Sequence, residues 1–129
     1  MPARRLGLIV LTMLSLSATA GPPPAPAPAC IPVPASAIVS LKELPSEVRK
    51  LLEQDSRGRG GIADAGEKFN ATDVIMDAAI PQTRFVAATA SDDCASVTVE
   101  RGGRGYSVQV LTFARTGKGW ELMPRAYGR

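Results

Sequence analysis

The sequence predicts a small α+β domain in which one N-terminal helix packs on an antiparallel meander of three to four strands. Two observations lead to this fold class. A segment with apolar residues at helical spacing comes first, and four segments with strand character follow it. The strands are separated by short turns, and strands joined by such short loops must be antiparallel neighbours. A helix is then needed to cover one face of the sheet.

Residues 44–54, "LPSEVRKLLEQ", carry the helix. Pro45 suits the first helical turn, where its missing N–H is not needed. Apolar side chains recur at helical spacing and form one face, at Leu44, Val48, Leu51 and Leu52. The glycines of residues 56–61, "SRGRGG", end the helix. Upstream, residues 36–44 are either a short strand or an added helical turn.

The strands are expected at residues 83–91, 94–100, 106–115 and 120–123. In residues 94–100, "CASVTVE", valines alternate with Ser96, Thr98 and Glu100, which is the pattern of a half-buried strand. Residues 106–115, "YSVQVLTFAR", have apolar groups on both faces, so this strand is expected in the centre of the sheet.

Residues 61–84 are ambiguous. The sequence "NATD" at residues 70–73 suggests a turn or a helix N-cap, and the apolar residues 74–76, "VIM", follow it. These residues are expected to form a short strand or a helical turn that ends before Pro81. Asp73 and Asp77 would share one face if the segment were helical.

The N-terminus predicts export. Arg4 and Arg5 precede an apolar stretch at residues 6–16, and Ala18-Thr19-Ala20 is a small-residue cleavage site. We therefore expect a signal peptide at residues 1–20, with no stable membrane span after its cleavage. Residues 21–36 form a spacer rich in proline and alanine, and residues 37–129 form the folded domain.

Two cysteines remain in the mature chain, Cys30 and Cys94. Because exported proteins fold in oxidising compartments, these residues predict one internal disulfide. The alternatives are two free thiols or an intermolecular bridge.

The stretch "ERGGRGYSVQV", residues 100–110, places three glycines between two strands. A phosphate-binding loop would need a following helix and the G-x-x-x-x-G-K-[ST] pattern. The glycines instead indicate a hairpin turn. The turn does not require its arginines, so Arg101 and Arg104, with Tyr106 beside them, are proposed as a partner-binding surface.

Composition restricts the chemistry. There is no histidine, which excludes Ser-His-Asp and Cys-His catalysis and removes the commonest zinc ligand. The chain carries +3 in total, and six basic against two acidic residues gather in residues 100–129. Carboxylates occur at Asp64 with Glu67, at Asp73 with Asp77, and at Asp92 with Asp93.

We expect a non-catalytic binding module, an inhibitor or immunity-type protein, that is periplasmic or secreted in a bacterium. Its expected partner is a protein, with no nucleic acid, no cofactor and no metal site. The alternatives are a small carboxylate-dependent hydrolase and an envelope accessory protein held by its proline spacer.

Overall fold

The computed structural model describes residues 21, 30–32 and 35–125. The predicted signal peptide and most of the predicted spacer lie outside the described residues. The elements follow in the order β1 (Ser36–Ile38), η1 (Leu41–Glu43), α1 (Ser46–Ser56), η2 (Arg57–Arg59), β2 (Thr83–Ala90), β3 (Cys94–Arg101), β4 (Ser107–Thr116) and β5 (Gly119–Leu122). Here η denotes a 3₁₀ turn. Among the described residues, no helix has both the length and the apolar character needed to span a bilayer.

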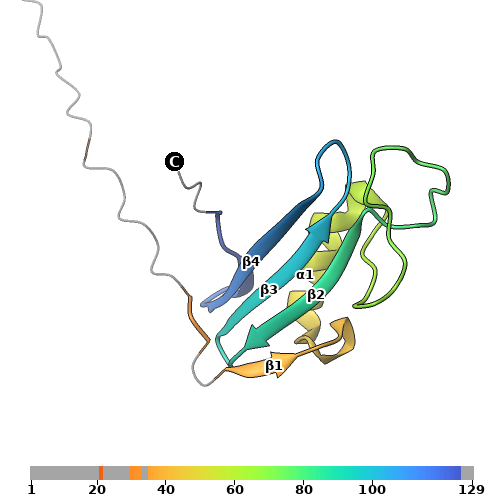
Figure 1. Ribbon diagram of the computed structural model, residues 1–129. Helices are drawn as coiled ribbons and strands as arrows, with labels where there is room; N and C mark the ends of the chain where they lie inside the picture. The colour runs from red at the N-terminus through yellow and green to blue at the C-terminus, as the bar shows by residue number, and fades with distance from the viewer. Residues whose placement is uncertain (1–20, 22–29, 33–34, 126–129) are drawn as a thin grey trace, which may run out of the picture.

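The strands form one antiparallel sheet in sequence order, β1-β2-β3-β4-β5 (Figure 1). The predicted α+β class is therefore confirmed, with one helix on an antiparallel meander. The predicted number of strands is wrong, because the sheet has five. The added strand is β1, which pairs Ser36 to Ala90 and Ile38 to Ala88. Only Ile38 of its three residues is buried, so the sequence of β1 shows no alternation long enough to identify a strand.

Helix α1 covers one face of the sheet (Figure 1). Val48 and Leu52 on the helix are fully buried, together with Phe85 and Phe113 on the sheet. Helix α1 ends at Ser56, and η2 continues the chain to Arg59. Gly60 closes η2 with a φ of 79°, a left-handed conformation that glycine adopts without a steric penalty. All the large buried side chains thus lie between α1 and the inner face of the sheet.

Among the described residues, no helix lies over the opposite face of the sheet, here called the outer face (Figure 1). Val86, Val108 and Val110 are 40%, 57% and 59% exposed. On this face Thr98 pairs with Val110, and Ser96 pairs with Thr112. The neighbours of the valines on β3 and β4 therefore include several hydroxyl side chains. Such a mixture of valine and hydroxyl residues is compatible with a sheet face that is exposed to water, as is common in antiparallel sheets.

Residues 60–82 connect η2 to β2 without helix or strand. The predicted short strand or helical turn at residues 74–76 is therefore wrong. One isolated bridge, Ala63 to Arg84 in parallel, ties the start of this loop to β2. Connections longer than about 12–15 residues without regular structure are uncommon in compact domains, where they are usually either functional loops or linker segments.

Candidate functional site

The loop of residues 60–82 and the β3–β4 hairpin meet at Gly102. Its N–H donates to the Gln82 carbonyl oxygen at 2.7 Å, and its own carbonyl accepts from Arg59 Nη1 at 3.1 Å. A Cβ at this position would collide with the Asn70 carbonyl oxygen and would lie 2.8 Å from Ala71 Cα. Only glycine permits this approach of two backbones, so Gly102 fixes the loop against the hairpin.

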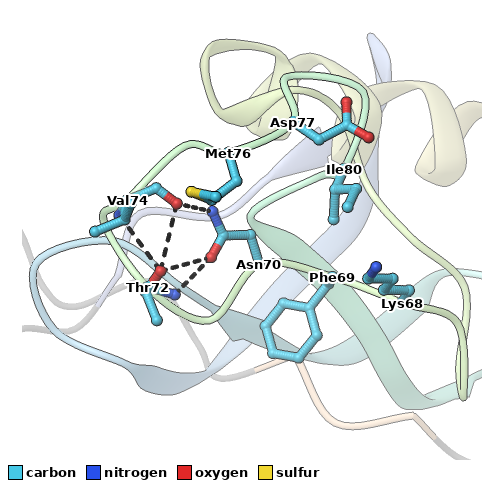
Figure 2. A pocket seen from close by; sticks show the side chains of 8 residues that line it. All are labelled: Lys68, Phe69, Asn70, Thr72, Val74, Met76, Asp77 and Ile80. Atoms are coloured by element: carbon cyan, nitrogen blue, oxygen red, sulfur yellow. Dashed lines mark hydrogen bonds between the residues drawn. The ribbon is translucent and has the colours of Figure 1, made fainter.

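The middle of the loop is ordered by its own side chains. Asn70 Oδ1 accepts from the backbone N–H of Thr72 at 2.9 Å and from its hydroxyl at 2.8 Å, and Asn70 Nδ2 donates to the Val74 carbonyl at 2.8 Å. Gln82 Nε2 also donates to the Thr72 carbonyl at 2.8 Å. Figure 2 shows the contacts among Asn70, Thr72 and Val74 beside a pocket that Phe69, Met76 and Ile80 help to line. These bonds connect residues 70–74 to one another and to Gln82 at the end of the loop.

Three consecutive apolar side chains project from this loop. Val74, Ile75 and Met76 are 59%, 65% and 90% exposed. Asp73 and Asp77 flank them, and both are exposed as well. We call residues 73–77 the loop tip. Isolated exposed apolar residues are ordinary on protein surfaces, whereas a contiguous group surrounded by polar residues is typical of an interaction site.

The structure places the predicted partner-binding residues in two different environments. Arg104 is exposed on the hairpin, and Tyr106 is 54% exposed. Arg101 is only 3% exposed and pairs with Asp55 of α1 through its Nη2. The expectation that Arg101 lies at the hairpin tip is thus wrong. Arg101 has the same orientation as Val97 and Val99, whose side chains face the core.

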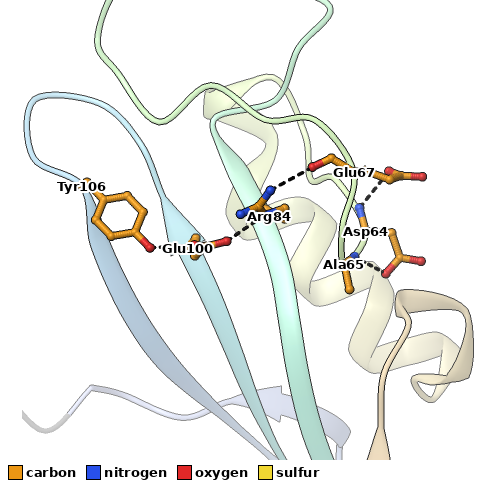
Figure 3. Close-up of polar contacts among 6 residues, drawn as sticks. All are labelled: Asp64, Ala65, Glu67, Arg84, Glu100 and Tyr106. Carbon is orange, nitrogen blue, oxygen red and sulfur yellow. Dashed lines mark hydrogen bonds and ion pairs between the residues drawn. The ribbon is translucent and has the colours of Figure 1, made fainter.

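Tyr106 begins a row of polar contacts across the outer face. Its hydroxyl donates to Glu100 Oε1 at 2.6 Å, and Arg84 Nε donates to Glu100 Oε2 at 2.7 Å. Arg84 also donates to the Glu67 carbonyl at 3.1 Å (Figure 3). Its guanidinium stacks on the Phe69 ring. The hydrogen bonds from Arg84 and Tyr106 lower the pKa of Glu100, while the bond to Glu100 raises the pKa of Tyr106. This row links the hairpin to the loop.

Of the carboxylates singled out in the sequence, Asp64 connects two turns. Asp64 accepts from the Ser40 hydroxyl at 2.6 Å, from the Leu41 N–H at 2.8 Å and from the Ala65 N–H at 2.7 Å. Partial burial of Asp64 acts to raise its pKa, but these hydrogen bonds together outweigh that effect and lower it. Because no helix forms at residues 73–77, Asp73 and Asp77 are not brought together on a helix face. Among the described residues, no three His, Cys, Asp or Glu side chains are grouped as a metal ion would require.

The predicted disulfide is confirmed. Cys30 is bonded to Cys94, the first residue of β3, with their Cα atoms 5.8 Å apart. Cys94 is thus at the end of β3 opposite the β3–β4 hairpin. The disulfide therefore fastens the predicted spacer, at Cys30, to the end of β3 that lies away from the β3–β4 hairpin.

The loop tip is the part of the candidate site that sequence reasoning missed. A sequence pattern that could identify it does exist. Residues 74–76 are three consecutive apolar residues between two aspartates, without the alternation of a strand. Comparison of the chain with protein-family models, with curated proteins and with solved structures finds no match.

Proposed function

We propose that the protein is an exported, non-catalytic binding module of the inhibitor or immunity type. A protein partner binds at one end of the domain, where the loop tip and the β3–β4 hairpin lie. The observation that carries this proposal is the exposure of Val74, Ile75 and Met76 on an ordered loop. Burial of these side chains in a complementary pocket would supply the favourable free energy of binding.

The order of the loop supports this role. A flexible loop loses conformational entropy when it binds, and that loss weakens the complex. The hydrogen bonds of Asn70 and the contact with Gly102 hold the loop before the partner arrives. Met76, the most exposed of the three, has an unbranched side chain that adapts to irregular pockets.

Charge defines the margin of the proposed surface. Asp73 and Asp77 flank the apolar residues, and Arg104 contributes a cation from the hairpin, with Tyr106 at its base. A matching partner has an apolar pocket bordered by basic groups, with a carboxylate that Arg104 can bind in bidentate fashion. Arg101 acts indirectly, because its ion pair with Asp55 holds the hairpin against α1.

The proposed location is the periplasm or the medium of a bacterium. The predicted signal peptide supports export, and so does the disulfide, because such bonds persist in oxidising compartments.

The test begins with recovery of a stoichiometric partner from the envelope fraction of the host, followed by affinity measurements with purified proteins. Ile75→Ser and Met76→Ser should each weaken binding at least tenfold, whereas Val39→Ser is the matched control. Val39 is 67% exposed, close to the 65% of Ile75, but it lies outside the loop tip. Arg104→Ala should weaken binding less, and most clearly at low salt.

Equal affinities of wild type, Ile75→Ser and Met76→Ser would contradict the proposal. Turnover of a cell-wall glycan without a stable partner would favour the hydrolase alternative instead.

A further inference from the structure

The edge of β4 is open along half of its length. β5 pairs with β4 only from Phe113 to Thr116, and the Met123 N–H adds a bond to the Thr112 carbonyl at 2.8 Å. Nothing in the part of the chain that the structure describes pairs with this edge between Ser107 and Leu111. An open strand edge is a template for another strand.

The direction of the free backbone groups follows from two hydrogen bonds. The Arg115 N–H donates to the Asp93 carbonyl, which lies on the β3 side, and the Thr112 carbonyl accepts from Met123 on the β5 side. Backbone groups alternate in direction along an antiparallel strand. The N–H and C=O groups of Val108 and Val110 therefore point away from β3, into the open edge.

This edge lacks the usual protection. Edge strands of monomeric proteins commonly carry lysine, proline or a bulge that prevents further pairing. Residues 106–114, "YSVQVLTFA", contain no charged residue and no proline, and the β3–β4 register runs without a shift. Val108 and Val110 are also 57% and 59% exposed.

We propose that the occupant of this edge is a second copy of the same chain. The two β4 strands would pair antiparallel about a twofold axis at Val108, which would join the two sheets into one. Val108 then pairs with Val108 of the second copy, and Val110 lies opposite Tyr106. Each such pair exchanges two backbone hydrogen bonds and uses the outward-pointing groups of Val108 and Val110.

The side chains suit a self-complementary contact. On the outer face, uncharged residues meet across the axis, so no like charges oppose one another. Placing the axis at Val108 also keeps the second strand clear of Thr112, whose edge is already occupied by Met123. The contact places Val108 beside Val108 of the other copy and Val110 beside its Tyr106, as cross-strand pairs on the outer face.

Gln109 gives an independent reason to place a second copy at this edge. Its Nε2 donates to Ser107 Oγ at 3.1 Å, while its Oε1 is buried and has no partner among the described residues. A buried acceptor without a hydrogen bond is costly. With the axis at Val108, Ser107 of the second copy lies opposite Gln109, which brings a hydroxyl donor beside the residue whose amide oxygen lacks a partner.

The dimer uses none of the loop-tip residues, whose exposure carries the proposed function. Tyr106 belongs to both surfaces, so the test uses Val108. Analytical ultracentrifugation of the chain from residue 21 should show a dimer whose fraction rises with concentration. Val108→Lys should shift the protein to a monomer, because two ammonium groups then face each other at the axis.

Val86→Lys is the matched control, since Val86 is an exposed valine of the outer face on β2, away from the open edge. This variant should remain dimeric, and thermal unfolding should show that both variants are folded. A wild-type protein that stays monomeric over the whole concentration range would overturn the proposal, and so would a dimeric Val108→Lys.

The register is tested with single cysteines. In Val108→Cys the two new cysteines would lie about 5.5 Å apart between Cα atoms, within the range of a disulfide. In Val110→Cys they would lie about 13 Å apart along the strands. Mild oxidation should therefore link Val108→Cys into a covalent dimer and leave Val110→Cys unlinked. Equal linking of both variants would exclude this register.

Discussion

Arg101 shows how a charged residue can belong to the core. Its side chain extends from β3 toward α1, where the guanidinium pairs with Asp55. The Asp55 side chain is 25% exposed, so water still reaches part of the pair. Removal of the arginine alone leaves a partly buried carboxylate without its counter-ion, and that loss is more harmful than the pair itself is favourable.

We predict that Arg101→Ala lowers the free energy of unfolding by about 3 kcal/mol. Arg104→Ala is the control, because it changes the same residue type in the same hairpin at an exposed position. That variant should stay within about 0.5 kcal/mol of wild type. Urea unfolding measures both values. Equal stability of the two variants would show that the ion pair with Asp55 contributes nothing.

The contact between the hairpin and the loop depends on the absence of a side chain at Gly102. We predict that Gly102→Ala destabilises the domain by about 2 kcal/mol or more, because the added methyl group must displace the backbone of residues 70–71. Gly105 is the matched control: it lies in the same hairpin, and a methyl group added there would have no neighbouring atom within 4 Å.

Urea unfolding should separate the two glycine variants, and hydrogen exchange should show faster exchange in residues 70–80 of Gly102→Ala alone. Unchanged exchange in that loop would mean that the loop keeps its conformation without the hairpin contact.

The elements with a strong periodic pattern were predictable from the sequence. The helix expected at residues 44–54 forms as Ser46–Ser56, and the four longer strands of the meander form where alternation or turn residues indicated them. The sequence does not decide β1, because three residues carry too little pattern. The apolar character of residues 74–76 suggests a buried element, but these residues are exposed in the structure.

The candidate site was less predictable than the fold. The arginines of the hairpin look equivalent in the sequence, and only their positions along β3 distinguish them. Arg101 continues the inward alternation of Val97 and Val99, whereas Arg104 lies beyond the strand. The contact of Gly102 with residues 70–71 joins distant parts of the chain, and no local pattern encodes it.

At the scale of the whole molecule, the disulfide joins residues with a sequence separation of 64. Closing a loop of this size in the unfolded chain is expected to stabilise the folded state by about 4 kcal/mol in the chain-entropy model. We predict a loss of this order in the double variant Cys30→Ser, Cys94→Ser, measured by urea unfolding.

Reductant should lower the unfolding midpoint of the wild type to that of the double variant and leave the variant unchanged. A wild-type midpoint that does not respond to complete reduction would contradict the prediction.

The disulfide also encloses the loop tip in a covalent ring, because residues 73–77 lie between Cys30 and Cys94. A protease that cuts the exposed loop therefore opens the ring without dividing the molecule. The helix-bearing fragment and the sheet-bearing fragment stay linked, and they separate on a gel only after reduction. A partner that hydrolyses the loop it binds would thus retain both halves of its ligand in one piece.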